Sequence, residues 1–273
     1  MLKVQTPWSV AEIYLHGAHL THFQKNGEPP LLFMSAKSWF KAAEPIRGGV
    51  PICFPWFGGR EGEPSHGFAR ILSWEVSETA VAPDGKVKIT LRLPQQLLKP
   101  EWSALQTTFA VTFADTLTME LTTKNESPDK TLEIEDCLHT YLHVGDISAV
   151  SITGLQGASY LDNAAGGNGE RKTDNESVLK ITKETNRLYL DTTNVVGVRD
   201  EKFRRMIRVE KSGSKSTVVW NPWTTQKMPD DFDPAYHKNM VCVEAGNIKQ
   251  NKISLKPGEA TALKAVLSTA PLK

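Results

Sequence analysis

The sequence has few cysteines: Cys53, Cys137 and Cys242 are the only three among its 273 residues. They lie far apart, and the chain contains neither a CxxC pair nor the ligand spacing of a zinc site. This scarcity argues against a disulfide framework, and an odd, small number of thiols favours a reducing compartment. We therefore expect free cysteines in a cytoplasmic protein.

The sequence also lacks long apolar runs and an excess of one charge. No apolar segment approaches the ~20 residues that span a bilayer, and residues 1–17 lack the charged and apolar regions of a secretion signal. The formal net charge is +1, from 32 basic (Lys and Arg) and 31 acidic residues. Charge thus favours neither nucleic acid nor a membrane as a partner.

Alternating apolar and polar residues recur over many short segments, which is the period-2 pattern of half-buried strands. Segments 107–115 and 116–125 predict a hairpin. Further strands are predicted at 11–17, 86–93, 131–143, 147–153, 178–182, 202–210, 216–220, 240–245, 251–255 and 260–267. The nearest approach to a helix is the short segment 94–102. Because no repeat or linker divides the chain, the pattern predicts an all-β sandwich or barrel, with residues 1–273 as one domain.

One segment departs from this pattern. Residues 46–70 read IRGGVPICFPWFGGREGEPSHGFAR, and they combine glycines, prolines and aromatic residues with Arg47, His66 and Arg70. Glycine and proline allow backbone geometry that regular elements do not use, and the arginine fork suits phosphate or carboxylate. The segment suggests an anion site, although both arginines could instead form weak surface ion pairs. The chain has no P-loop and no strand-GxGxxG-helix unit.

Two further side chains are candidates for chemistry. Glu244 interrupts an otherwise apolar strand, where a buried carboxylate is costly without a partner. It either points to solvent or faces a pocket, where desolvation would raise its pKa and suit a general base. His139 shares a strand face with Tyr141 and His143. A metal site at His139 and His143 is disfavoured, because such a pair binds zinc on a helix and no third ligand is evident.

Together these segments form an ordered set that resembles a known family. The motifs are RGGVPICFPWFG, SHGFAR, LHTYLHVGDI, VVWNPW and VCVEAGNI, in that order over nearly the whole chain. They resemble the hexose-6-phosphate mutarotases (glucose-6-phosphate 1-epimerases) of the galactose-mutarotase-like superfamily. The resemblance implies a large antiparallel β-supersandwich. It also implies a cytoplasmic isomerase without metal or cofactor, which interconverts the α and β anomers of a sugar phosphate.

The resemblance also implies roles for single residues. His139 and Glu244 match the catalytic pair, and Arg47 and Arg70 match the contacts to substrate and phosphate. Ser65, where relatives can have glutamine, and His66 are implied to line the pocket. Asn186, in KETNRLYL, stands where relatives tend to carry a sugar-binding aspartate.

These roles predict a mechanism in which Glu244, ionised at neutral pH, takes the proton of the anomeric hydroxyl. His139 protonates the ring oxygen, because its ordinary pKa of ~6.5 lets it hold or lose a proton near neutrality. Glucose 6-phosphate is the favoured substrate, and we expect a monomer. The alternatives are an aldose 1-epimerase acting on unphosphorylated sugar and an inert carbohydrate-binding protein on the same scaffold. A glycoside-processing enzyme is disfavoured, because no matched pair of carboxylates is evident.

Overall fold

The computed structural model describes residues 1–272. Within them, the alternating segments form two eight-stranded sheets and two smaller ones, and every strand ladder is antiparallel. The prediction of an antiparallel all-β fold is confirmed. No helix of these residues is both long and apolar enough to cross a membrane.

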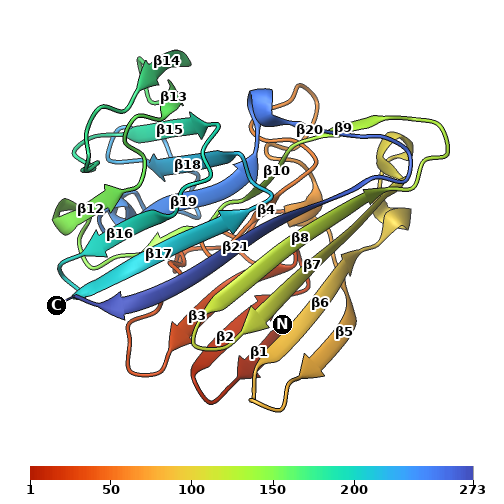
Figure 1. The fold of residues 1–273 in the computed structure, drawn as a ribbon, viewed down its shortest axis with the longest axis horizontal. Coiled ribbons are helices and arrows are strands. Elements are labelled where there is room, and N and C mark those ends of the chain that lie inside the picture. The colour runs from red at the N-terminus through yellow and green to blue at the C-terminus, as the bar shows by residue number, and fades with distance from the viewer. Residues whose placement is uncertain (273) are drawn as a thin grey trace.

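The first large sheet carries the candidate site. Its strands, in spatial order, are β14 (Glu170–Thr173), β13 (Ser159–Asp162), β15 (Thr185–Leu190), β18 (Ser216–Asn221), β19 (Met240–Asn247), β10 (Asp136–Leu138) and β4 (Ile52–Cys53), with β11 (Tyr141–His143) also paired to β19. In Figure 1 this sheet lies above the long diagonal strands of the second sheet.

The second large sheet runs through the middle of the molecule. Its order is β12 (Val150–Thr153), β16 (Val196–Asp200), β17 (Arg205–Ser212), β21 (Ala260–Pro271), β8 (Leu117–Asn125), β7 (Leu105–Phe113), β6 (Val87–Leu93) and β5 (Glu75–Val81). The small sheets are β1 (Leu2–Gln5), β2 (Ser9–Tyr14) and β3 (His19–Lys25), and β20 (Ile253–Leu255) with β9 (Leu132–Ile134).

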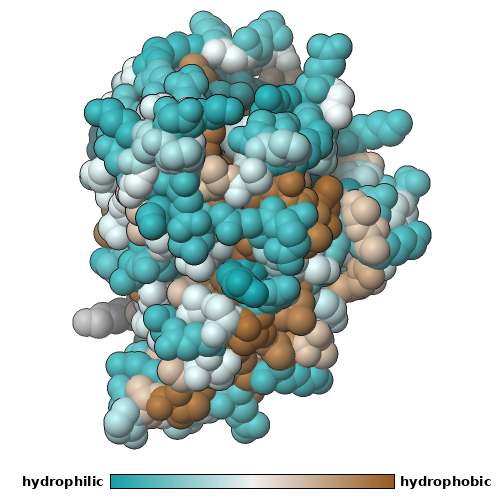
Figure 2. Space-filling model, turned by 90° about the vertical axis from the view of Figure 1, so that its right-hand side faces the viewer, coloured by the Kyte–Doolittle hydropathy of each residue, from teal (hydrophilic) through white to brown (hydrophobic). Residues whose placement is uncertain are grey.

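Within residues 1–272, helical structure is limited to short 3₁₀ turns. They are η1 (Ala69–Ile71), η2 (Gln95–Leu97), η3 (Pro100–Trp102), η4 (Ile147–Ala149), η5 (Pro234–Asn239) and η6 (Lys249–Asn251). The segment 94–102, the nearest approach to a helix in the sequence, forms two of these turns. Figure 2 shows the face at the right of Figure 1, where apolar side chains gather in a band between hydrophilic regions.

Strand β19 contributes side chains both to the hydrophobic core and to the candidate site. All eight of its residues are buried. Val241 and Val243 belong to the main hydrophobic cluster, whereas Cys242 belongs to a second cluster. Because side chains alternate along a strand, Glu244 lies on the same face as Cys242. Both faces of this strand are covered, which is why it reads as an apolar run.

The predicted strands are confirmed in most places and wrong in three. The hairpin of 107–115 and 116–125 is present as β7 and β8. Segment 178–182 is not a strand, because Leu179 forms only an isolated bridge to Ile152. Segment 131–143 is broken into β9, β10 and β11, and 147–153 begins with the 3₁₀ turn η4. The break after Leu138 places His139 outside the regular ladder.

Candidate active site

A cavity of about 580 Å³ opens on the outer face of the first sheet. Its lining includes every residue that the sequence singled out for the site: Arg47, Ser65, His66, Arg70, His139, Asn186 and Glu244. These residues come from segments up to about 200 positions apart. The fold therefore brings the candidates to one place, which is the geometric requirement for a shared function.

His139 and Glu244 are held together by strand pairing. Leu138, the last residue of β10, faces Ala245 of β19, so His139, which follows β10, and Glu244, which precedes Ala245, are neighbours. The backbone N–H of His139 donates to the carbonyl of Pro51 at 3.0 Å. Its Nδ1 lies 3.4 Å from Oε1 of Glu244. The interpretation that Glu244 faces a pocket is correct, and the alternative that it points to solvent is wrong.

Burial sets the proton state of this pair. Glu244 is 1% exposed, and its Oε2 accepts a hydrogen bond from the Cys137 thiol at 3.2 Å. Desolvation raises the pKa of Glu244 to about 8. Desolvation, and next the positive charge of Arg70, lowers the pKa of His139 to about 3. Without substrate both shifts favour the uncharged forms, a protonated Glu244 and a neutral His139, in contrast to the expected ionised Glu244 and a histidine that titrates near pH 7.

Aromatic rings surround His139. Tyr141 stacks on its imidazole, with ring centroids 4.8 Å apart and planes 14° apart, and Trp220 meets both rings edge-on at 5.9 Å. Flat apolar surfaces of this kind suit a sugar ring. His143, by contrast, is absent from the cavity lining, and its ring packs against Phe203.

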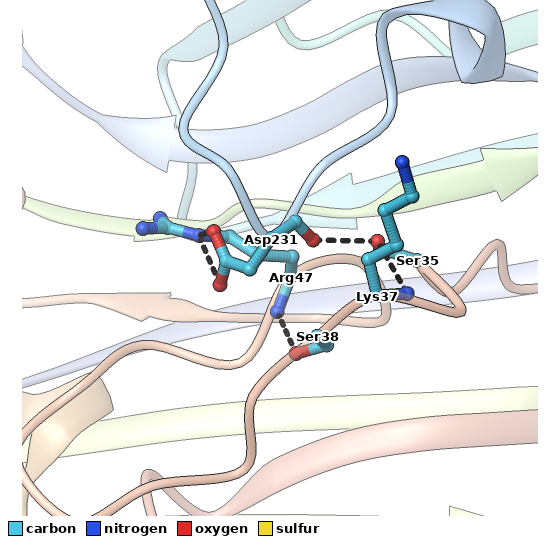
Figure 3. Close-up of polar contacts among 5 residues, drawn as sticks. All are labelled: Ser35, Lys37, Ser38, Arg47 and Asp231. Atoms are coloured by element: carbon cyan, nitrogen blue, oxygen red, sulfur yellow. Dashed lines mark hydrogen bonds and ion pairs between the residues drawn. The ribbon is translucent and has the colours of Figure 1, made fainter.

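Arg47 is oriented by a buried carboxylate rather than by a surface ion pair. Its Nε–H donates to both oxygens of Asp231, at 3.0 and 3.1 Å. Ser35 Oγ donates to the Asp231 carbonyl at 2.7 Å, and the Arg47 backbone N–H donates to Ser38 Oγ (Figure 3). Because only Nε is engaged within residues 1–272, the two terminal amino groups of Arg47 stay available to a ligand.

Arg70 is the second guanidinium of the cavity. Its Nη2 donates to the carbonyl of Ser65 at 2.6 Å, whereas its buried Nε has no hydrogen-bond partner within residues 1–272. His66 accepts the backbone N–H of Gly58 on Nδ1 at 3.2 Å. Burial, followed by the charge of Arg70, lowers the pKa of His66 well below its usual value. The imidazole is therefore neutral and leaves the arginines as the cations of this region.

The glycines of segment 46–70 serve two different purposes. Gly49 and Gly67 have positive φ and pack against the chain itself: a Cβ on them would lie 2.3 Å from the Leu20 carbonyl oxygen and 2.0 Å from that of Phe54. Only Gly58 and Gly59 line the cavity. At these two positions the absence of a side chain leaves the backbone open to a ligand.

Amide side chains form another part of the lining. Asn186 lies on β15, and its backbone carbonyl accepts a hydrogen bond from the backbone N–H of Asn163 at 2.8 Å. Gln226 accepts the indole N–H of Trp220 at 2.9 Å. Sequence reasoning did not single out Asn163, Gln226 or Trp220 as site residues. Only Trp220 carried a signal, because it belongs to the VVWNPW motif.

Comparisons with known proteins agree with this site. The family model described as aldose 1-epimerase matches residues 2–268. The chain belongs to the aldose 1-epimerase family. A relative from Cenchrus ciliaris, named as a provisional glucose-6-phosphate 1-epimerase, is 34% identical over 96% of this chain and 82% of its own. A relative from Escherichia coli K12 with the same name is 33% identical over 89% of this chain and 82% of its own.

A solved structure of a similar protein has the same fold as this chain. The crystal structure of a protein from Salmonella typhimurium, titled as a provisional mutarotase, superposes with a TM-score of 0.87 at 27% identity, over 98% of this chain and 90% of that one. The predicted galactose-mutarotase-like supersandwich is thereby confirmed. Membership of the aldose 1-epimerase family assigns the protein to enzymes that interconvert sugar anomers.

Proposed function

We propose that this family member is a hexose-6-phosphate mutarotase that interconverts the α and β anomers, with glucose 6-phosphate as its substrate. The observation that carries the proposal is the close pair of His139 and Glu244 in a cavity that also holds two guanidinium groups. The pair supplies a proton acceptor and a proton donor. The guanidinium groups of Arg47 and Arg70 suit a phosphate dianion.

The proposed reaction is ring opening and reclosure. Glu244 takes the proton of the C1 hydroxyl while His139 protonates the ring oxygen O5. The C1–O5 bond breaks, the aldehyde carbon rotates, and O5 then attacks its other face as the two protons return. The sum of protons on the enzyme is unchanged after each turnover, so the step needs no external acid or base.

The substrate's phosphate helps to create the reactive proton state. Arg70 contributes to the low pKa of His139, so a dianion on Arg70 would offset that charge and favour a protonated imidazole. The proton would pass from Glu244 to His139 across their 3.4 Å separation. Ionised Glu244 beside protonated His139 is the state that the mechanism requires, and the offset of the Arg70 charge acts in that direction.

Two further features support the expected location and domain organisation of the protein. The three cysteines are unpaired and buried, which supports a cytoplasmic location. The family match over residues 2–268 supports treating 1–273 as one domain. We expect the enzyme to act as a monomer on a free sugar phosphate, without metal or cofactor.

The decisive experiment is a coupled assay that consumes one anomer of each sugar as it forms. Glucose 6-phosphate, free glucose and free galactose are compared at equal concentration. We expect the sugar phosphate to be strongly preferred. Equal or better use of a free sugar would make the protein an aldose 1-epimerase for unphosphorylated sugar. Binding without acceleration of any of the three would make it a carbohydrate-binding protein.

A further inference from the structure

Three potential metal ligands lie together beside the cavity. One nitrogen of His139, the sulfur of Cys242 and one oxygen of Glu244 all lie within 4.8 Å of one another. Strand β19 provides two of them, because residues 242 and 244 point to the same face. His139 comes from the break between β10 and β11. The sequence did not reveal this set of ligands, because the spacing of residues along the chain suggested only His139 and His143 as a possible ligand pair.

Two atoms of this cluster are buried without a partner. Neither Nδ1 of His139 nor Oε1 of Glu244 has a hydrogen-bond partner within residues 1–272. The two atoms are 3.4 Å apart. Buried polar atoms are rarely left unpaired, since a missing partner leaves the cost of removing them from water uncompensated. Both atoms face each other, so a single cation between them would satisfy both.

The ligand chemistry selects the kind of cation. Nitrogen, thiolate and carboxylate together match Zn²⁺, whose tetrahedral bonds of ~2.0–2.3 Å put neighbouring ligand atoms roughly 3.3–3.8 Å apart. The separation of Nδ1 and Oε1 already falls in this range. All separations among the three ligand atoms lie within 4.8 Å, so a contraction of at most about 1 Å would bring the others into it. Water in the cavity could supply the fourth ligand.

We infer that Zn²⁺ binds to His139, Cys242 and Glu244 and inhibits mutarotation in competition with substrate. Binding places the Cys242 thiolate and the Glu244 carboxylate on the metal and releases the protons of both groups to solvent. Two anionic ligands offset the nearby positive charge of Arg70. Inhibition rests on the proposed function, because the ion would occupy both the proton acceptor and the proton donor. Binding itself does not depend on that function.

The test uses variants of two buried cysteines. Cys242 belongs to the cluster, whereas Cys53 is equally buried but lies outside it. Zn²⁺ binding is measured by equilibrium dialysis for the wild type, Cys242→Ala, Cys242→Ser and Cys53→Ala. Co²⁺ serves as a spectroscopic probe, because a cobalt–thiolate bond gives a charge-transfer band. The serine variant keeps nearly the original volume, in case the alanine variant does not fold.

We expect one Zn²⁺ per wild-type chain, with affinity reduced more than ~100-fold by either Cys242 substitution and unchanged by Cys53→Ala. The cobalt–thiolate band should follow the same pattern. Zn²⁺ should inhibit the wild type and Cys53→Ala, and excess glucose 6-phosphate should relieve the inhibition. Absence of stoichiometric binding, or binding and a thiolate band that persist in Cys242→Ser, would overturn the inference. If no variant shows activity, the binding data still decide it.

Discussion

The guanidinium of Arg47 is locked to Asp231 along one edge only: its Nε–H donates to both carboxylate oxygens, at 3.0 and 3.1 Å. Asp231 is 1% exposed, and its backbone carbonyl is itself held by Ser35. The pairing fixes the plane of the guanidinium and leaves its terminal amino groups free of Asp231 (Figure 3). Asp231 is therefore a positioning residue for Arg47, the side chain that we propose contacts the substrate.

Asp231→Asn should raise KM for glucose 6-phosphate by roughly 10-fold, because Arg47 loses a charge-assisted partner worth about 1.5–3 kcal/mol. The turnover number should change little. Removal of a negative charge near the phosphate acts in the opposite direction, but we expect loss of orientation to dominate. Asp233→Asn is the matched control, since Asp233 pairs with the exposed Lys37. An unchanged or lower KM in Asp231→Asn would show that Arg47 needs no such support.

The acid–base pair gives the second prediction. Glu244→Gln and His139→Asn should each lower turnover by ~10²-fold or more, because each removes a group that transfers a proton. Substrate binding, measured by calorimetry, should persist. His143→Asn is the control, because that histidine lies outside the cavity lining. Near-normal turnover in either cavity variant would remove that residue from the mechanism.

The arginines give the third prediction. Arg70→Ala or Arg47→Ala should weaken kcat/KM for the sugar phosphate by about 1.5–3 kcal/mol, the range for hydrogen bonds to a charged group. Any activity on free sugar should fall much less. Arg60→Ala serves as the control, because Arg60 stacks over Trp56 in the same segment and does not line the cavity. Equal losses on both kinds of substrate would mean that the arginines do not bind the phosphate.

Sequence reasoning located the site better than it described it. The ordered motifs correctly predicted that Arg70, His139 and Glu244 line one cavity. Each of these residues belongs to a short motif that can be recognised in the sequence alone. The Arg47–Asp231 pair joins residues 184 positions apart, so no local pattern could predict it. The proton states also depend on burial, which follows from packing between distant strands rather than from neighbours in the chain.

The fold was predictable where one strand face is exposed. Buried and partly exposed residues alternate along β7 and β8, and the matching alternation of apolar and polar residues in the sequence predicted this hairpin. Strand β15 was missed, since its burial does not alternate: Thr185 and the last three residues are buried, and only Asn186 and Arg187 are partly exposed. Strand β4 has only two residues, Ile52 and Cys53, which is too short for any periodicity.

The fourth prediction concerns Asp136, a buried carboxyl with one oxygen bonded to Asn247 and the other unpartnered within residues 1–272. Desolvation raises the pKa of Asp136 from 3.8 to about 7. Because the folded pKa lies above the unfolded one, its contribution to stability is complete below pH ~4 and is lost as pH rises through 7.

Asp136→Asn should remove this pH dependence, because the amide stays neutral and can still accept from Asn247. Urea unfolding of both proteins at pH 5 and pH 8 gives the difference in unfolding free energy at each pH. The variant should gain relative to the wild type at pH 8, by up to about 4 kcal/mol over the whole range. A difference that is the same at both pH values would mean that the carboxyl is ionised throughout.

The last prediction tests the amide at Asn186. An aspartate there would offer sugar hydroxyls two charged acceptor oxygens, whereas asparagine offers one neutral acceptor and two donors. Asn186→Asp should therefore raise kcat/KM for glucose 6-phosphate several-fold, since a charge-assisted hydrogen bond gains roughly 1 kcal/mol. Its side chain lines the cavity and its backbone carbonyl bonds to Asn163, so the strand should be unaffected and thermal stability nearly unchanged.

The new charge at residue 186 has an opposing effect, because it would repel the substrate's phosphate. We expect Arg47 and Arg70 to offset that repulsion, since both line the same cavity. Asn163→Asp is the matched comparison: it puts the same charge on the neighbouring amide of the lining, at a position for which the family resemblance implies no aspartate. A gain confined to Asn186→Asp would support a direct contact between residue 186 and a sugar hydroxyl. A flat or lower kcat/KM would show that the pocket works with a neutral side chain there.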